Sequence, residues 1–175
     1  MDLIFWRHAD ALDAVDGQED LLRELTPKGE KQAAKIGHWL DRQLPEGVRV
    51  ISSPATRAEQ TARALGRKYK LKSDLLPDAS ALDLLEAVGW PHSKMSVVVV
   101  GHQPVIGHCI AYLLGMPGND LPVRKGTVWW LRSRVRVLHQ RVRQPHQRTT
   151  SRGGRARHVA QPARHSRQRS VARNS

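Results

Sequence analysis

The chain has 175 residues, enough for one domain with a well-developed core and too few for two comfortable ones. Its formal net charge of +13 would suggest nucleic acid or an acidic surface as partner. However, residues 1–131 hold 16 Lys and Arg against 16 Asp and Glu, whereas residues 132–175 hold 13 Arg and no acid. The charge-balanced first part therefore gives no reason to expect a nucleic-acid-binding domain there.

The cysteine content and the lengths of the apolar runs indicate where in the cell the protein is expected. Cys109 is the only cysteine, which excludes an intramolecular disulfide and a cysteine-based zinc site. The first residues lack the basic, apolar and small-residue segments of a signal peptide, and no apolar run approaches the ~20 residues of a membrane span. We therefore expect a cytoplasmic protein without a membrane partner.

The first elements that the sequence predicts are a strand, an acidic loop and a helix. Leu3–Trp6 is a run of four apolar residues, which is typical of a buried strand. Residues 10–24 are rich in acidic side chains and contain Gly17, which favours an exposed loop. Thr26 as N-cap and Pro27 at the first helical position then predict a helix that ends before Pro45.

The following residues continue the alternation of strands and helices. We expect a strand over 48–52, a helix from the loop at 53–57 to about residue 69, a short strand near 75–76 and a helix over 81–88. Four valines at 97–100 predict another buried strand, followed by a helix from about 105 to 114 and a last strand within 126–131. This order predicts an α/β fold, a three-layer sandwich whose mostly parallel central sheet has helices on both faces.

Residues 132–175 differ in composition from the domain at 1–131. They contain no Phe, Trp, Ile, Tyr, Met, Lys, Asp or Glu. Because such a segment buries too little apolar surface to offset its ordering entropy, we expect a disordered, Arg-rich tail. The loss of every acidic residue favours a frame-shifted translation, which resequencing the gene would test. The alternative is a nucleic-acid-binding tail, although it lacks aromatic residues that stack on bases.

Cationic and donor-rich side chains follow three of the predicted strands. Arg7 and His8 come after the first strand, Arg57 after the second and His102 after the four valines. The carboxyl ends of parallel strands meet at one edge of a sheet, so we expect these side chains to share a crevice. Two guanidinium groups and two imidazoles match a dianionic phosphoryl group. With four such donors a metal ion is unnecessary, and we expect neither a metal nor another cofactor.

Three motifs resemble those of the histidine phosphatase superfamily, also called the phosphoglycerate-mutase-like family. They are Arg7-His8-Ala9, the run Ser-Ser-Pro-x-x-Arg-Ala-x-Gln-Thr at residues 52–61, and Gly101-His102. The Arg-His-Ala-Asp start and the run Asp-x-x-Arg-x-Leu-Thr-x-x-Gly at 20–29 look like the small bacterial branch, the SixA-type phosphohistidine phosphatases. The resemblance extends from about residue 2 to residue 131.

The resemblance implies a role for each matching residue. His8 matches the family nucleophile, which attacks phosphorus and becomes a phosphohistidine. Arg7, Arg57 and His102 match the residues that hold the phosphoryl oxygens, where their charge would stabilise the transition state. Ser53 lies near the same edge by its position in the chain, and we expect it to contact the phosphate.

The sequence departs from larger family members in its proton donor. Those members carry an inserted acidic residue, and no insertion of that size is present here. Asp20 and Glu19, in the loop after His8, are the candidates. An imidazole leaving group, with an ordinary pKa near 6.5, departs with less help from an acid than an alkoxide does.

The expected function is hydrolysis of phosphohistidine on proteins by a metal-independent, monomeric phosphatase that releases inorganic phosphate. Two alternatives remain: a phosphomonoesterase acting on a small phosphorylated metabolite, and a nucleic-acid-binding protein that uses the Arg-rich tail. Comparing turnover of a phosphohistidine protein with that of small phosphorylated metabolites would distinguish the first alternative from the expected function. Deletion of residues 132–175 followed by salt-dependent DNA binding would test the second.

Overall fold

The computed structural model describes residues 2–116, 118 and 121–132, and the predicted tail from residue 133 on lies outside this part of the chain. One five-stranded sheet has the order β3-β2-β4-β1-β5. Its strands are β1 (Asp2–Arg7), β2 (Arg49–Ser52), β3 (Lys70–Leu71), β4 (Val97–Gly101) and β5 (Val128–Arg132). Only the β1–β5 pairing is antiparallel. The mostly parallel sheet is confirmed. Strand β5 ends at Arg132, one residue beyond the boundary at residue 131 that the composition predicts for the domain.

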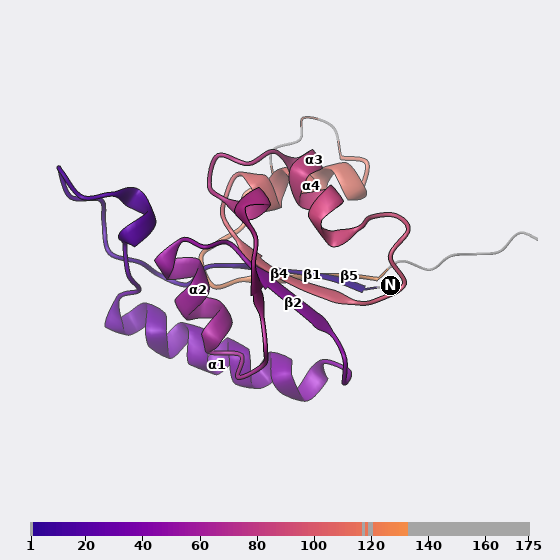
Figure 1. Ribbon diagram of the computed structural model, residues 1–175, viewed down its shortest axis with the longest axis horizontal. Coiled ribbons are helices and arrows are strands. Elements are labelled where there is room, and N and C mark those ends of the chain that lie inside the picture. The colour runs from indigo at the N-terminus through magenta and orange to yellow at the C-terminus, as the bar shows by residue number, and fades with distance from the viewer. Residues whose placement is uncertain (1, 117, 119–120, 133–175) are drawn as a thin grey trace, which may run out of the picture. The chain divides into compact units, whose positions relative to one another are not determined.

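Helices cover both faces of this sheet. They are α1 (Pro27–Gln43), α2 (Thr56–Arg63), α3 (Ala81–Val88) and α4 (Val105–Leu113), and single 3-10 turns lie at η1 (Asp20–Leu22) and η2 (Ser73–Leu75). Figure 1 shows α1 and α2 on one side of the sheet and α3 and α4 on the other. Alternate residues of β1 therefore enter different cores: Leu3 and Phe5 pack with α3 and α4, whereas Ile4 and Trp6 pack with α1 and α2. The predicted three-layer sandwich is confirmed.

The register of the central strands brings their carboxyl ends to one level. Arg7 of β1 pairs with Gly101 of β4, and Ser52 of β2 pairs with Val100 of β4. Main-chain hydrogen bonds continue one residue further, because His8 donates to the Gly101 carbonyl at 3.0 Å and Ser53 donates to the Val100 carbonyl at 3.0 Å. The residues that follow these three strands thus start from fixed, adjacent positions.

The first turn of α1 holds the loop that follows β1. Thr26 caps the helix as expected, since its hydroxyl accepts a 2.9 Å hydrogen bond from the Gly29 amide. Gly29 lies directly against the Asp10 carbonyl, and a Cβ at this position would overlap it. Only glycine allows α1 to approach the chain two residues after His8 this closely.

The segment after α2 differs from the prediction. The helix expected to reach about residue 69 ends at Arg63, and Gly66 turns the chain with a positive φ of 76°. The short strand expected at 75–76 lies instead at Lys70–Leu71, and Leu75 belongs to a 3-10 turn with its side chain in the core. The pair Leu75-Leu76 is apolar because Leu75 packs in the core from a 3-10 turn. The exposed edge strand Lys70–Leu71 carries no apolar pattern that would predict it.

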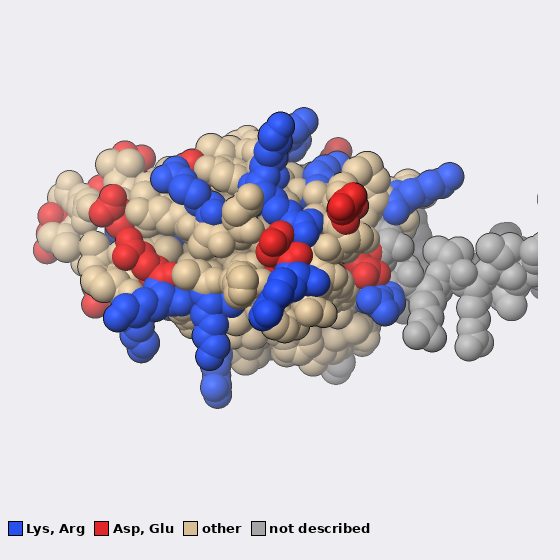
Figure 2. Space-filling model, turned by 90° about the horizontal axis from the view of Figure 1, so that it is seen from below, with Lys and Arg blue, Asp and Glu red and all other residues tan. Residues whose placement is uncertain are grey.

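Charges of both signs are spread over the face of the molecule that Figure 2 shows. Figure 2, which views the molecule of Figure 1 from below, shows Lys and Arg interspersed with Asp and Glu, with acidic side chains gathered at the end where the loop of residues 10–24 projects. No helix in residues 2–116, 118 and 121–132 is long and apolar enough to cross a membrane.

Candidate active site

His8 is oriented by the main chain that follows it. The side chain is buried, with 6% of its surface exposed, and its Nδ1 lies 2.8 Å from the Ala9 carbonyl oxygen. A carbonyl can only accept, so Nδ1 carries the proton of the neutral ring and Nε2 keeps a free lone pair. Burial, together with the positive charges of nearby cationic side chains, lowers the pKa of His8 to about 4. The His8 ring is therefore neutral at neutral pH and has the free lone pair that a nucleophile requires.

His102 lies beside His8 at the end of β4. The two ring centroids are 5.2 Å apart and the ring planes are tilted by 54°. Nε2 of His102 is 2.9 Å from the Ser53 hydroxyl oxygen, whereas Nδ1 is buried without a hydrogen-bond partner among the described residues. Burial, reinforced by the neighbouring His8, lowers the pKa of His102 to about 3, so this ring is also neutral.

Two arginines, Arg7 and Arg57, join His8 and His102 in a group of four side chains. Arg57, in the first turn of α2, is buried and donates from Nη1 to the Asp20 main-chain oxygen at 2.7 Å and from Nη2 to Asp20 Oδ2 at 2.9 Å. Arg7 donates from Nη1 to the Val123 carbonyl. Arg57 is thus anchored through both of its Nη atoms, and Arg7 is anchored through Nη1.

Several donors of this group are left without protein partners. Six buried side-chain nitrogen and oxygen atoms of the described residues lack a hydrogen bond, and three of them are Nε of Arg7, Nε of Arg57 and Nδ1 of His102. Unpaired buried polar groups are costly and are retained where a ligand satisfies them. Unpaired donors around an imidazole with a free lone pair are typical of a site that binds a phosphoryl group, as in phosphoryl-transfer enzymes.

Comparison with known proteins agrees with this class. The family model for the histidine phosphatase superfamily (branch 1) matches residues 3–91. Phosphohistidine phosphatase SixA from Escherichia coli strain K12 is 32% identical over 131 residues, which cover 70% of this chain and 79% of the relative. The chain belongs to the histidine phosphatase superfamily, in its SixA-type branch, and is a phosphatase.

Solved structures have the same fold. The protein histidine phosphatase SixA in complex with tungstate has a TM-score of 0.56 and 31% identity, and the match covers 70% of this chain and 81% of that protein. Phosphoserine phosphatase from Entamoeba histolytica, in complex with 3-phosphoglyceric acid, has a TM-score of 0.57 and 19% identity, covering 74% of this chain and 89% of that one. The second likeness supports the fold alone.

The remaining predicted residues lie around this group in different ways. Ser53 is fully buried and its hydroxyl contacts the His102 ring. Asp20 reaches the group through Arg57, and it also pairs with Arg23 at 2.7 Å. Partial burial opposes ionisation, but hydrogen bonds from the two arginines outweigh it and hold the pKa of Asp20 below its ordinary value. Glu19 is exposed.

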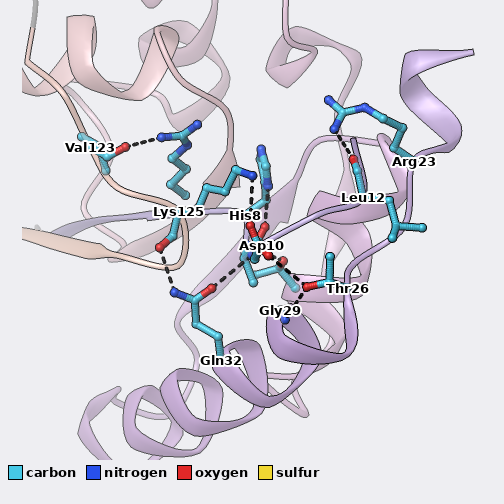
Figure 3. Close-up of polar contacts among 12 residues, drawn as sticks. His8, Asp10, Leu12, Arg23, Thr26, Gly29, Gln32, Val123 and Lys125 are labelled. Carbon is cyan, nitrogen blue, oxygen red and sulfur yellow. Dashed lines mark hydrogen bonds and ion pairs between the residues drawn. The ribbon is translucent and has the colours of Figure 1, made fainter. Parts of the chain in front are cut away.

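Lys125 is a site residue that the sequence did not indicate. It lies in the loop before β5, donates from Nζ to Asp10 Oδ1 at 3.0 Å, and its charge helps to lower the pKa of His8. Gln32 of α1 joins the two loops, because its amide donates to the Lys125 carbonyl at 2.9 Å and accepts from the Asp10 amide at 3.1 Å. Figure 3 shows the Lys125 and Gln32 side chains reaching toward Asp10, beside His8. No motif marks a single loop lysine; only the return of β5 beside β1 brings it here.

We expect activity without a metal ion. Across residues 2–116, 118 and 121–132, no group of three or more His, Cys, Asp or Glu side chains is arranged to hold one. The charged arginines and the neutral His102 ring are instead the groups that we expect to stabilise the phosphoryl oxygens. Turnover should therefore be the same before and after dialysis against EDTA, and loss of activity that zinc or magnesium restores would contradict this expectation.

Acidification should destabilise the fold before it protonates the site. Unfolded histidines take up protons near their ordinary pKa of 6.5, whereas folded His8 and His102 remain neutral down to about 4 and about 3. The unfolded state then binds more protons, so the free energy of unfolding falls as the pH drops through this window, by about 1.4 kcal/mol per histidine for each pH unit. Urea unfolding at about pH 7.5, 5.5 and 4.5 should show this slope, and His102→Gln should reduce it. An unchanged slope in the variant would contradict the buried neutral state.

Proposed function

We propose that this phosphatase hydrolyses phosphohistidine on proteins through a covalent phosphohistidine intermediate on His8. The observation that carries the proposal is the His8 ring itself, which is neutral and holds its only proton on Nδ1, bonded to the Ala9 carbonyl. Nε2 is then free to attack phosphorus from within a group of unpaired cationic and neutral donors.

The reaction has two steps. In the first, the substrate ring carries a proton from solvent on its other nitrogen, Nε2 of His8 forms a bond to phosphorus, and the bond from phosphorus to the substrate nitrogen breaks. The substrate ring then leaves as neutral imidazole. In the second, water forms a bond to phosphorus while the bond from phosphorus to Nε2 breaks, which releases inorganic phosphate and a proton to solvent and restores His8. Arg7, Arg57 and His102 would hold the equatorial oxygens in both steps, since their free donors lie around the nucleophile.

The carboxylates near the site favour an easily released leaving group. Asp20 is held below its ordinary pKa by its two arginines, and the hydrogen bond from Lys125 lowers the pKa of Asp10. Both are ionised at neutral pH and neither holds a proton to deliver. An alkoxide requires such a proton, whereas a phosphohistidine ring takes its proton from solvent near neutral pH and departs as imidazole without a dedicated acid. This supports phosphohistidine over phosphate esters of sugars.

Competing substrates test the proposal directly. A histidine-phosphorylated carrier protein, a sugar phosphate and a nucleoside monophosphate would be compared by kcat/KM under the same conditions. We expect the phosphoprotein to be preferred by at least about 100-fold, the equivalent of about 2.7 kcal/mol in transition-state binding. A sugar phosphate turned over as fast or faster would instead assign the enzyme to small metabolites.

Substitutions in the acidic loop test for a proton donor. We expect Asp20→Asn to lower kcat/KM by about tenfold or less, because Arg57 loses a charged partner but no proton transfer is lost. The loss should be equal for aryl phosphates with leaving groups of different pKa. A loss that grows with leaving-group pKa, in Asp20→Asn or in Glu19→Gln, would identify that residue as the general acid.

The matched control for this series is Asp16→Asn. Asp16 lies in the same loop and is exposed. Its substitution removes one negative charge from this loop without removing a partner of Arg57. A similar loss in this variant would mean that the loop acts through its overall charge.

A further inference from the structure

We propose that Ser53 is a positioning residue that holds His102 as its Nδ1–H tautomer, so that this ring donates a hydrogen bond to the phosphoryl group. Ser53 acts through His102 and does not itself contact the substrate, contrary to its expected role as a phosphate contact. The proposal rests on phosphoryl transfer at His8, as proposed above, and is independent of which phosphorylated molecule is the substrate.

The first step is the hydrogen bonding of the Ser53 hydroxyl. Its oxygen accepts a 3.2 Å hydrogen bond from the Ala55 amide and lies 2.9 Å from Nε2 of His102. The side chain is completely buried, so its own proton cannot be donated to bulk water. Among the described residues, Nε2 of His102 is the one acceptor placed for that proton. A donating Ser53 requires an unprotonated Nε2.

The second step compares the two neutral tautomers of His102. If Nε2 carried the proton, it would donate to Ser53, the serine proton would be left without an acceptor, and the buried Nδ1 would be an unpaired lone pair. If Nδ1 carries the proton, both ends of the contact with Ser53 are satisfied and only the Nδ1–H remains unpaired. Because buried unpaired groups are costly, the second tautomer is preferred.

The third step connects this tautomer to catalysis. A phosphoryl group is surrounded by acceptor oxygens, so only a protonated ring nitrogen can bind it. His102 lies beside the nucleophile and has one ring nitrogen not engaged by Ser53, namely Nδ1. Burial keeps the ring neutral at neutral pH, and its single proton must therefore lie on Nδ1 for the ring to donate. By donating to Nε2, Ser53 keeps the proton of the ring on Nδ1, the nitrogen that is left for the phosphoryl group.

Nuclear magnetic resonance of the resting enzyme tests the tautomer without any substrate. Two-bond proton–nitrogen correlations in the full-length protein labelled with nitrogen-15 distinguish a protonated ring nitrogen from an unprotonated one. With His102 assigned through a His102→Gln variant, we expect the Nδ1–H form at about pH 7.5. In Ser53→Ala, the spectrum should shift toward the Nε2–H form. An Nε2–H tautomer in the unmodified protein, or an unchanged tautomer in Ser53→Ala, would overturn the proposal.

Kinetics of the same variants give a second readout. Ser53→Ala should lower kcat for an aryl phosphate by at least about tenfold, because one transition-state donor is lost in most molecules. The matched control is Ser52→Ala, which removes a neighbouring buried hydroxyl that donates to the Ser53 carbonyl at 3.0 Å and does not contact His102. Equal losses in the two variants would overturn the specific role of Ser53.

Failure of this inference is distinguishable from failure of the proposed substrate. If the enzyme prefers small phosphate esters but His102 has the expected tautomer, the substrate proposal fails and the role of Ser53 stands. If phosphohistidine is preferred but the tautomer of His102 is independent of Ser53, the substrate proposal stands and the role of Ser53 fails.

Discussion

Replacement of His8 by alanine should abolish formation of the phosphorylated enzyme and lower turnover by at least about 10³-fold. Nε2 of His8 is the nucleophile in the proposed mechanism, so its removal takes away the atom that attacks phosphorus in the first step. The phosphorylated species would be trapped with labelled substrate by rapid denaturation at alkaline pH, and the modified histidine would be mapped by mass spectrometry. Label should appear on His8 of the unmodified protein and be absent from His8→Ala.

The control for this experiment is His38→Ala, which removes an exposed histidine of α1 that belongs to none of the motifs. It should retain both label and turnover. Turnover in His8→Ala within about tenfold of the unmodified protein, or label on another histidine, would contradict the covalent mechanism. A matching urea-unfolding curve would show that the variant is folded.

Replacement of Arg57 by alanine should lower kcat/KM by about 10²- to 10³-fold, which corresponds to about 3 to 4 kcal/mol of transition-state stabilisation. The guanidinium is buried, held on its outer side by Asp20, and keeps a free Nε for the phosphoryl group. The loss should lie mainly in kcat, because phosphoryl transfer is catalysed chiefly by charge stabilisation. Steady-state kinetics with an aryl phosphate would measure it.

Two further variants separate charge from geometry at this position. Arg57→Lys retains the positive charge but cannot form a planar, two-pronged contact, so we expect it to recover only a small part of the loss. Arg63→Ala removes an exposed arginine of the same helix, whose partner is Glu59, and should be close to unmodified activity. Full recovery in Arg57→Lys would mean that a point charge is sufficient.

The alternation of apolar runs and helix signals was enough to predict the layered α/β fold. The four valines of β4 and the Thr26-Pro27 start of α1 are local patterns, and each became the element that it indicated. The end of α2 and the position of β3 could not be predicted in this way. They depend on Gly66 turning the chain and on Leu75 finding a place in the core, which are consequences of packing.

The sequence by itself indicated the candidate residues Arg7, His8, Arg57 and His102, because each lies at or just after the end of a strand or at the start of the next helix, and parallel strands end at one edge. Only the tertiary structure decided how these groups are protonated and held. The contact of Ala9 with His8, of Ser53 with His102, and of Asp20 with Arg57 are set by burial and by the register of β2, β4 and β1. Lys125 enters the site through the antiparallel return of β5, a long-range pairing to which no local pattern points.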